Sequence, residues 1–563
     1  MEATQDISAK SAGEAGSKLI SSKRVNNEGD PRSKLWLIGE APGETEERLG
    51  RPFIGPSWDM VLGPALASLG KKREEVFIAN LCPYRPSRNN FEFLEGSTQL
   101  SQGVSELASL ATIHKPNCIL LLGAKPLKAF TSHESIGTWR GSILPSSLVA
   151  GQKVMATYHP AAVIREIKQY PIFQIDLKRA INESQFPELS YSKRNYVLNP
   201  PVADLKHWIG YIKRNCDIIS VDIESIRKGQ SIICVGFGLS SDLAICVGWD
   251  SPEKVSLIRE ILEDPQIEKI FHNGTFDTEV LFLNGINVKG YHFDTMVAAH
   301  VMEPELRRGL DFLTSIYTRE PYYKKEGRAA LPDDSKAWSS KDNKDDVFIY
   351  NGKDCAVTFE IYESQLRELH EQGLWSFFRY EMSLVPVATH ISRSGIRVNL
   401  DLLDRLRVDL EQRISSDQNH LYGLIGKEVN VNSNPQVCKL LFEDLKLPKR
   451  LKDSKLTTGN DALISLTGYC KSRLAILKQD SSIKEWKQKL DVLTVIISIR
   501  ENRKLLSSYV KMKLSNDGRA RSTYKVAATK TGRFGASKYV DDTGLNSQTF
   551  PRGDIELSEG EDE

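Results

Sequence analysis

Two sets of short apolar runs constrain the fold of this chain most strongly. In the first set, between residues 34 and 184, the runs KLWLIG, EVFIAN, NCILLLG and KVMATYH alternate with stretches of helical length. This pattern is typical of strands buried on both faces of a parallel sheet. After the polar connector ESQFPELSYSKRN, the second set reads DIISVDIES, SIICVGFGLS, LAICVGW and EKIFHN. Its first three runs are close enough to form an antiparallel meander, so we predict a parallel-sheet α/β/α domain followed by a mixed-sheet α/β domain.

A third region has a different character. From about residue 374 to residue 514, leucine-rich helical patterns with many lysines dominate, which predicts a mainly helical region. Within it, residues 439–533 contain 22 Lys and Arg against 9 Asp and Glu. Such an excess indicates a polyanion-binding module, and the alternative is a solvated basic face of a helical domain. A chain of 563 residues has room for about three separately buried cores.

The two ends and the cysteines narrow the class of protein. Residues 1–33 are rich in Ser, Gly, Lys and Glu without periodicity, so we predict a disordered tail, and residues 553–563 read as a solvated acidic tail. We find neither a signal-peptide core nor an apolar run of about 18 residues, so we expect a cytoplasmic protein without membrane contact. Eight scattered cysteines without a C-x-x-C pair predict buried free thiols rather than disulfides or a metal site.

Two carboxylates lie on one face of a predicted strand in the second domain. In DIISVDIES, the two-residue period of a strand places Asp222 and Glu224 side by side, with Val221 and Ile223 on the opposite face. Such pairs are common on solvated strands, so this motif alone is a weak signal. Near a core the two charges would repel each other, and hard divalent cations such as Mg²⁺ or Mn²⁺ would relieve that repulsion.

Further polar groups come from two predicted helices. Asp277 begins a helix after the strand KIF, and Tyr350 and Asp354 are four residues apart in DVFIYNGKDCAVTF, so the phenol and the carboxylate share a helix face. Phosphodiester hydrolysis with two metal ions about 3.5–4 Å apart needs carboxylates to hold both ions and a polar group to aim the attacking water. The sequence contains this inventory.

These motifs closely resemble the proofreading 3′→5′ exonuclease domain of family A DNA polymerases, a ribonuclease H-like fold with four acidic residues and a tyrosine. The matching motifs are D-x-E at 222–224, N-G-T-F-D at 273–277 and Y-x-x-x-D at 350–354, with FDTM around Asp294 between the last two. The resemblance covers residues 195–370. It implies that Asp222, Glu224 and Asp354 bind the ion that activates water. It also implies that Asp222 bridges to a second ion, that Asp277 supports that ion and that Tyr350 positions the nucleophile.

Polar residues of the first domain lie where its predicted strands end. Gly39 and Glu40 follow LWLI, Asn80 follows VFIA, and His159 follows VMATY. Open parallel sheets bind ligands outside the carboxyl ends of their strands, so these groups should converge on one pocket.

The same stretches resemble family 4 uracil-DNA glycosylases over residues 34–183. The matches are GEAPGETEERLGRPFIG, IANLCPYRP, the RG of WRG, and TYHPAAVIR. The resemblance implies that Glu40 orients the hydrolytic water, Phe53 stacks on an extruded uracil, Asn80 reads its edge and His159 stabilises the leaving base. That family carries an iron–sulfur cluster on four cysteines, whereas here Tyr84 stands at one ligand position, so we expect no cluster. The alternative to activity is a retained fold that serves only for DNA binding or docking.

The third region contains, in order, the stretches LVPVATHISRSGIRVNLDLLDRL, VNVNSNPQVCKLLFEDLKLP, IRENRKLLSSYVK and TKTGRFGASKYVDDTGLNSQTFP. Over residues 376–552 they resemble the start of the family A polymerase domain, its thumb and first palm segment. The resemblance implies that Arg503, Lys504 and Arg533 contact primer–template phosphates, which would explain the basic excess. Thr531, Gly532 and Arg533 form the T-G-R signature of that domain. Asn546 and Gln548 resemble the segment that follows this signature in the family.

Polymerisation also needs a palm aspartate pair and a fingers helix, neither of which we find in the sequence. We therefore expect one of two arrangements. Either the polymerase is split, and a second chain with palm and fingers is the partner that polymerase activity needs, or this is a truncated product. The whole architecture resembles replicative polymerases of certain large phages, which would place the protein in the host cytoplasm.

The leading functional hypothesis is a 3′→5′ DNA exonuclease that uses two divalent cations and serves as the proofreading part of a family A DNA polymerase in replication. Its partner would be DNA, at 3′ ends and primer–templates. One alternative is a repair enzyme that excises uracil. The other is a DNA-binding assembly subunit of a split polymerase.

Overall fold

The structure is a computed structural model, and it describes residues 19–226, 231–333, 335–339, 341, 344–477 and 479–550. It divides into two compact units, Met1–Met382 and Ser383–Glu563. The start of the predicted disordered tail and the predicted acidic tail lie outside the described residues. Among the helices that the structure describes, none is both long enough and apolar enough to cross a membrane.

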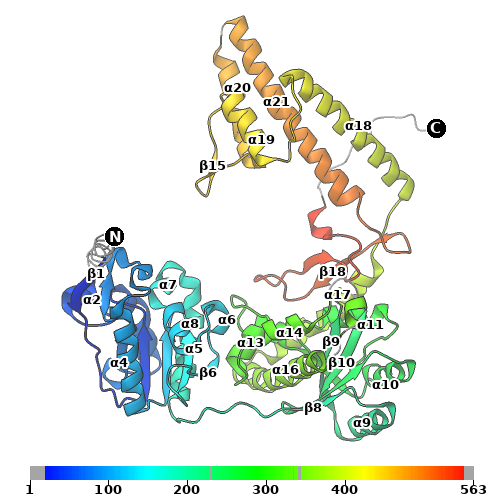
Figure 1. The fold of residues 1–563 in the computed structure, drawn as a ribbon. Helices are drawn as coiled ribbons and strands as arrows, with labels where there is room; N and C mark the ends of the chain where they lie inside the picture. Colours follow the sequence, from blue (N-terminus) through cyan, green and yellow to red (C-terminus); the bar gives the residue numbers. More distant parts are fainter. Residues whose placement is uncertain are drawn as a thin grey trace, which may run out of the picture. The chain divides into compact units, whose positions relative to one another are not determined.

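The first unit begins with a five-stranded sheet (blue and cyan in Figure 1). The order of its strands is β3-β2-β5-β7-β6. Its strands are β2 (Leu35–Gly39), β3 (Phe77–Asn80), β5 (Cys118–Leu122), β6 (Ile143–Pro145) and β7 (Lys153–Thr157). The helices of this part include α2 (Glu44–Leu49), α3 (Gly63–Ser68), α4 (Thr98–His114), α5 (Ala124–Thr131), α6 (Ile136–Trp139), α7 (Pro160–Arg165) and α8 (Tyr170–Glu183). The pairings are parallel except that β6 runs antiparallel to β7, so the predicted parallel α/β architecture is confirmed with one antiparallel edge.

A short strand precedes this sheet. β1 (Ile20–Arg24) pairs antiparallel with β4 (Tyr84–Pro86), and the next residue, Val25, is buried. The expectation of a disordered tail through residue 33 is therefore wrong for this segment. Strand pairing satisfies its backbone hydrogen bonds, and such a long-range partner cannot be read from a polar composition.

The second sheet of the first unit has six strands in the order β13-β12-β9-β10-β11-β8. They are β8 (Asn195–Leu198), β9 (Ile218–Ser225), β10 (Ile232–Gly238), β11 (Leu243–Gly248), β12 (Glu268–Phe271) and β13 (Tyr291–Asp294). β9, β10 and β11 form the predicted antiparallel meander, and β12 joins β9 in parallel, which confirms the mixed sheet.

Helices surround this second sheet. They are α9 (Val202–Asn215), α10 (Pro252–Leu262), α11 (Thr275–Leu283), α12 (Thr295–Met302), α13 (Leu310–Tyr317), α14 (Lys324–Ala330), α15 (Ser335–Ser339) and α16 (Asp345–Glu371). The 27-residue helix α16 packs against β9, β10 and β11. The strand carboxylates and the helix groups predicted to form a site are therefore neighbours.

The second unit is mainly helical, as predicted. After α17 (Trp375–Ser394), which contains the division between the units, its helices are α18 (Leu400–Ile425), α19 (Asn434–Cys438), α20 (Asn460–Ile476) and α21 (Asp480–Leu505). Three two-stranded ribbons accompany them: β14 (Ile396–Arg397) with β17 (Arg519–Ala520), β15 (Leu451–Lys452) with β16 (Lys455–Leu456), and β18 (Ser522–Lys525) with β19 (Gly535–Lys538). Leu463, Leu466 and Leu493 are fully buried where α20 and α21 pack together.

The eight cysteines are free thiols, and six of them are buried. This agrees with the prediction made from their apolar surroundings.

Candidate active sites

The carboxylates of Asp222 and Glu224 project from the interior strand β9. Their partners across the antiparallel pairing are Gly236 and Cys234 of β10. A Cβ at Gly236 would lie 2.3 Å from the Oδ1 atom of Asn351. The glycine therefore leaves room for Asn351, which reaches the strand from α16.

Helix α16 completes a cluster of carboxylates. Asp222, Glu224 and Asp354 each contribute one oxygen, and these three oxygens lie within 4.8 Å of one another. Tyr350 lies one turn before Asp354 on the same helix, as the spacing predicted, and both side chains are buried. Oxygen-only donors at this separation suit a hard divalent cation such as Mg²⁺ or Mn²⁺. The residues thus fit a metal ion of the predicted kind.

Burial makes this cluster costly without a cation. It raises the pKa of the Asp222 and Glu224 carboxyls well above their ordinary range, and the neighbouring carboxylates raise it further. Burial also raises the pKa of the Tyr350 phenol, so this group keeps its proton at neutral pH. Tyr350 can therefore act as a hydrogen-bond donor but not as a base.

Asp277 and Asp294 have different surroundings. Asp277 lies in the first turn of α11, its Oδ1 atom accepts a hydrogen bond of 3.3 Å from the Ile223 amide, and burial raises its pKa to about 7. It is thus held next to the Asp222–Glu224 strand although it is not one of the three grouped ligands. Asp294 instead caps α12, and it accepts hydrogen bonds from the amides of Asn273 and Gly274. These contacts stabilise the N-G-T-F-D turn and give Asp294 a structural role rather than that of a metal ligand.

Three residues of this site were missed by sequence reasoning. The amide of Asn351 donates to the Oδ2 atom of Asp222 over 2.9 Å. Tyr323 donates through its hydroxyl to Asp354 Oδ1, and the Lys324 ammonium donates to Asp354 Oδ2, each over 2.5 Å. Asn351 lies between Tyr350 and Asp354 in the sequence, and this position could have indicated that it belongs to the site. Tyr323 and Lys324 precede α16 by more than twenty residues in a lysine-rich stretch, and no periodicity marks them.

The first sheet brings its predicted residues together at the carboxyl ends of its strands. A Cβ on Gly39 would lie 2.3 Å from Phe53 Cζ and 2.6 Å from Asn80 Oδ1, so glycine at the end of β2 lets these side chains meet. The rings of Phe53 and His159 are 5.7 Å apart between centroids. A pocket of about 550 Å³ adjoins them, and its lining includes Glu40 and His159. The strand ends therefore lie close together as predicted. Glu40 and His159 line the pocket, whereas Gly39 and Asn80 lie behind its lining.

Three polar side chains at or beside this pocket differ in their hydrogen bonding and protonation. His159 Nδ1 accepts the Ala161 amide over 3.1 Å, and burial lowers the imidazole pKa to about 4. The neutral ring then carries its hydrogen on Nε2, which is free to donate. Asn80 is buried, and its Nδ2 atom has no hydrogen-bond partner among the residues that the structure describes. Burial also raises the pKa of Glu40, while the Lys125 amide opposes this shift.

The backbone at Phe53 is strained. Its φ of 47° lies in the left-handed region, which is unfavourable for an aromatic residue. Glu46 accepts the Phe53 amide hydrogen, and Arg73 donates to the Phe53 carbonyl over 2.9 Å. These contacts keep the ring, which is 2% exposed, against Gly39. Strain at functional positions persists only where surroundings fix it, and Glu46 and Arg73 do so here. No sequence signal marked them.

Tyr84 lies in β4, at the position where the resembling family has a cysteine ligand. Among the residues that the structure describes, the cysteines do not form a group that could hold a metal ion.

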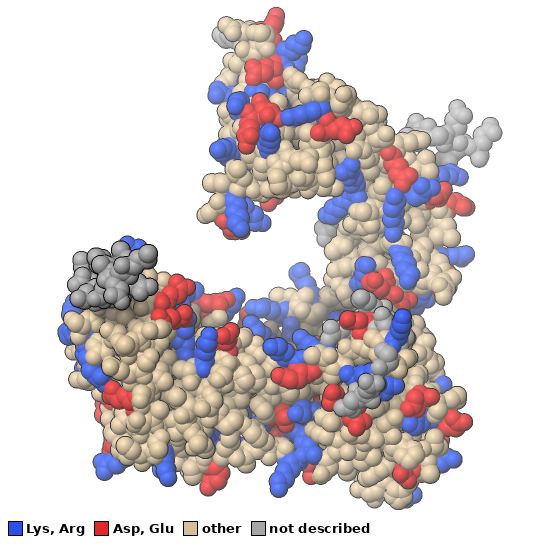
Figure 2. Space-filling model, in the orientation of Figure 1, with Lys and Arg blue, Asp and Glu red and all other residues tan. Residues whose placement is uncertain are grey.

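The residues expected to contact DNA lie in the second unit. Arg503 and Lys504 are in the last turn of α21, Thr531 and Arg533 lie exposed between β18 and β19, and Gln548 donates to the Phe534 carbonyl over 2.7 Å. The structure thus places Gln548 beside the T-G-R segment. In Figure 2, Lys and Arg side chains are interspersed with Asp and Glu on the visible faces.

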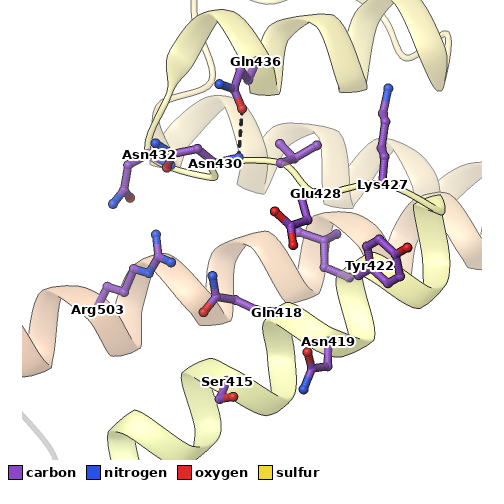
Figure 3. Close-up of a pocket in the computed structure, with 12 residues that line it drawn as sticks. Ser415, Gln418, Asn419, Tyr422, Lys427, Glu428, Asn430, Asn432, Gln436 and Arg503 are labelled. Atoms are coloured by element: carbon purple, nitrogen blue, oxygen red, sulfur yellow. Dashed lines mark hydrogen bonds between the residues drawn. The ribbon is translucent and has the colours of Figure 1, made fainter.

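Arg503 lines a polar groove of about 950 Å³ between α18, α21 and the segment 427–436. Figure 3 shows its guanidinium reaching from α21 toward the segment with Asn430 and Asn432. The backbone N–H of Asn430 donates to the side-chain Oε1 atom of Gln436 over 2.9 Å. Amide side chains rather than a cluster of cations therefore dominate the groove.

Comparison with protein families divides the chain into three parts. Residues 27–183 match the uracil DNA glycosylase superfamily, residues 203–370 match the family of 3′-5′ exonucleases, and residues 400–539 match DNA polymerase family A. The three matches lie in the order in which the three resemblances occur in the sequence, and the domain bounds stay a prediction.

Individual relatives fall into the same groups. The chain is 33% identical over 141 residues to the type-4 uracil-DNA glycosylase of Thermotoga maritima, which is 25% of this chain and 71% of that protein. It is 27% identical over 330 residues to DNA polymerase I of Chloroflexus aurantiacus, which is 56% of this chain. The chain spans 26% and 32% of the length of the two DNA polymerases I from Treponema pallidum and Chloroflexus aurantiacus. A second chain with palm and fingers stays a prediction.

Among solved structures, the chain is similar to the POL domain of Pol1 from M. smegmatis in complex with DNA primer-template and dNTP. The TM-score is 0.46 at 18% identity, over 63% of this chain and 56% of that one.

Proposed function

The chain belongs to the uracil DNA glycosylase superfamily through residues 27–183, and its next two parts have the domain architecture of a family A DNA polymerase. From this architecture we propose that the chain removes nucleotides from the 3′ ends of DNA. In this proposal, the exonuclease proofreads DNA synthesis, and its cofactors are two Mg²⁺ or Mn²⁺ ions. The observation that carries the proposal is the cluster of half-buried Asp222 with buried Glu224 and Asp354. Tyr350 lies beside it on the same helix as Asp354.

Each residue has a role that follows from its position. Asp222, Glu224 and Asp354 would hold one cation, and Asp277 would help to hold the second. The bound ions would neutralise charge at the scissile phosphate and favour deprotonation of water. Asn351 fixes the orientation of the Asp222 carboxylate through its hydrogen bond. Tyr350, which stays protonated, would donate its hydroxyl hydrogen to the attacking water or the phosphate.

A labelled primer tests the proposal. The full chain is incubated with Mg²⁺ and a 5′-labelled strand, and the products should form a ladder that shortens from the 3′ end. The same strand labelled at its 3′ end should release mononucleotides at once. The ladder should vanish with EDTA and in Asp222→Ala, and a mismatched 3′ end should be degraded faster than a paired one. A ladder that persists in Asp222→Ala would refute the site assignment.

A second candidate function, excision of uracil from DNA, is favoured by the first sheet. There the unpartnered Asn80 amide and the Phe53 ring meet beside Gly39, and the Phe53 ring neighbours His159. His159 lines the adjoining pocket and offers its Nε2 hydrogen. A uracil edge offers acceptors to both donors, and its face can stack on the phenyl ring. Glu40 would orient the water that replaces the base.

Uracil excision has its own assay. A strand with a single uracil is treated with the protein and then with alkali, which cleaves at an abasic site. Cleavage that is lost in Asn80→Ala supports the pocket assignment. An intact strand would leave the first domain with a docking role alone.

A further inference from the structure

The segment Tyr322–Lys324 links the exonuclease site to the domain that precedes it in the chain. On one side, the Lys324 Nζ atom lies 2.5 Å from Asp354 Oδ2 and 3.3 Å from the Tyr350 hydroxyl. The Tyr323 hydroxyl lies 2.5 Å from Asp354 Oδ1. Lys324 is 6% exposed and Tyr323 is 9% exposed. Both oxygens of Asp354 therefore take their hydrogen bonds from this segment.

The next turn of α14 packs on the tyrosine of the site. A Cβ at Gly327 would lie 2.0 Å from Tyr350 Cδ2, so the helix backbone and the phenol ring are in direct contact. The placement of α14 thus sets the position of Tyr350 as well as of Asp354.

On its other side, the segment contacts the glycosylase-like domain. The ring of Tyr322 meets the edge of Trp139 at 5.5 Å between centroids, and Trp139 itself stacks on His133 at 3.6 Å. Trp139 is the last residue of α6, which lies near α13 and α14 in Figure 1. A small pocket at this junction is lined by Thr138 of the first domain and by Tyr322, Tyr323 and Lys324.

Two arginines of the glycosylase-like domain hold the chain just before the segment. Arg179 of α8 donates to the carbonyls of Ser315 and Ile316, each over 2.9 Å, and to that of Thr318. These carbonyls belong to the C-terminal end of α13 and the residue after it, where a helix leaves acceptors unsatisfied. Arg140 donates to the Ser315 hydroxyl over 2.9 Å and pairs with Asp176. Lys324 is the sixth residue after Thr318 in the chain.

We propose that the glycosylase-like domain is a structural part of the exonuclease, because Trp139 and Arg179 position the Tyr322–Lys324 segment on Asp354 and Tyr350. This inference rests on the proposed exonuclease function. Trp139 and Arg179 are positioning residues that act through Lys324 and Tyr323 and do not touch substrate. The proposal gives the first domain a role in proofreading that does not depend on whether it excises uracil.

A displacement of the Tyr322–Lys324 segment should change both the reaction rate and the affinity for metal ions. A shift of about 1 Å at a reacting group can lower a rate by about 10²-fold, so Trp139→Leu and Arg179→Ala should lower kcat for 3′-end removal by at least about tenfold. KM for DNA should stay within about twofold because neither residue contacts it. Withdrawal of the Lys324 charge from Asp354 should also tighten Mn²⁺ binding by about tenfold.

The experiment measures kcat, KM and Mn²⁺ affinity by electron paramagnetic resonance for wild type, Trp139→Leu, Arg179→Ala and Lys324→Met. The matched control is Arg24→Ala, which removes an arginine that pairs with Glu106 within the first domain. Trp139→Phe, which keeps an aromatic ring, should restore most of kcat. The double variant Trp139→Leu/Lys324→Met should lose no more than Lys324→Met alone, because both act through one contact.

The outcomes separate this inference from the proposed function. An inactive wild type would contradict the exonuclease itself. An active wild type, with kcat and Mn²⁺ affinity of Trp139→Leu within about twofold of it, would overturn the positioning role. Additive losses in the double variant would overturn it as well. Should Arg179→Ala fail to fold, as judged by circular dichroism, the Trp139 variants decide the question.

Discussion

The hydrogen bond from Asn351 to Asp222 offers a sharp test of how the exonuclease site is built. Asn351 is fully buried, and its amide donates over 2.9 Å to the Oδ2 atom of Asp222. Replacement of Asn351 by alanine removes the one group on α16 that fixes this carboxylate, so Asp222 should become free to turn away from Glu224 and Asp354.

The magnitude follows from the kind of bond. A hydrogen bond to an ionised group contributes about 1.5–3 kcal/mol, which corresponds to about a 10- to 150-fold change in an equilibrium constant. Loss of a residue that orients a metal ligand costs about 10–100-fold in metal affinity. We therefore expect Asn351→Ala to bind Mn²⁺ about 10–100-fold more weakly and to need correspondingly more Mg²⁺ for half-maximal degradation of a labelled primer.

A matched control lies on the same helix. Gln365 is also fully buried, and its amide donates over 3.1 Å to the Thr295 carbonyl, far along α16 from the carboxylates. Gln365→Ala should lower the melting temperature about as much as Asn351→Ala and leave Mn²⁺ affinity unchanged. Equal Mn²⁺ affinities of Asn351→Ala and wild type, or equal losses in both variants, would refute the reasoning.

Three further predictions concern packing and protonation. Gly327→Ala should lower kcat for 3′-end removal at least about tenfold, because its Cβ would lie 2.0 Å from the Tyr350 ring. The control Gly468→Ala, whose Cβ would meet nothing within 4 Å, should keep the wild-type rate. Equal rates of primer degradation in the two variants would contradict this. Gly39→Ala should abolish any uracil excision without affecting the exonuclease, because its Cβ would displace Phe53; alkali cleavage of a uracil-containing strand checks it. The His159 pKa of about 4 lies below its value of about 6.5 in an unfolded chain, so stability should fall as pH drops from 6.5 towards 4. At pH 4.5 this effect lowers the free energy of unfolding by about 2–3 kcal/mol, and His159→Gln should not show that part of the loss. Thermal unfolding checks this, and an equal fall in stability between pH 7 and pH 4.5 in both proteins would contradict it.

The parts of the exonuclease site that could be predicted are those set by local periodicity. The two-residue period of a strand placed Asp222 beside Glu224, and the helical period placed Tyr350 beside Asp354. The contacts of Lys324 with Asp354 could not be predicted, because the chain returns to the site through α13 and α14 from a stretch without a pattern. Long-range placement of this kind depends on packing between domains, which sequence periodicity does not encode.

The pocket of the first domain shows the same division. The rule that ligands bind at the carboxyl ends of parallel strands was enough to expect that Gly39, Asn80 and His159 converge. The left-handed backbone of Phe53 depends on Glu46 and Arg73, and only the folded structure reveals these contacts. The strand β1 was missed for a related reason, because its partner β4 is sixty residues away in the chain.

The most direct test of the central claim compares two carboxylates of one helix. Asp354 belongs to the proposed metal cluster, whereas Glu368 accepts a hydrogen bond of 2.8 Å from the Tyr317 hydroxyl. Single-turnover removal of the 3′ nucleotide with Mg²⁺ should slow by about 10³-fold or more in Asp354→Asn, since several kcal/mol of stabilisation would be lost, and should change by less than about threefold in Glu368→Gln. A wild-type rate in Asp354→Asn would contradict the claim that this cluster is the active site.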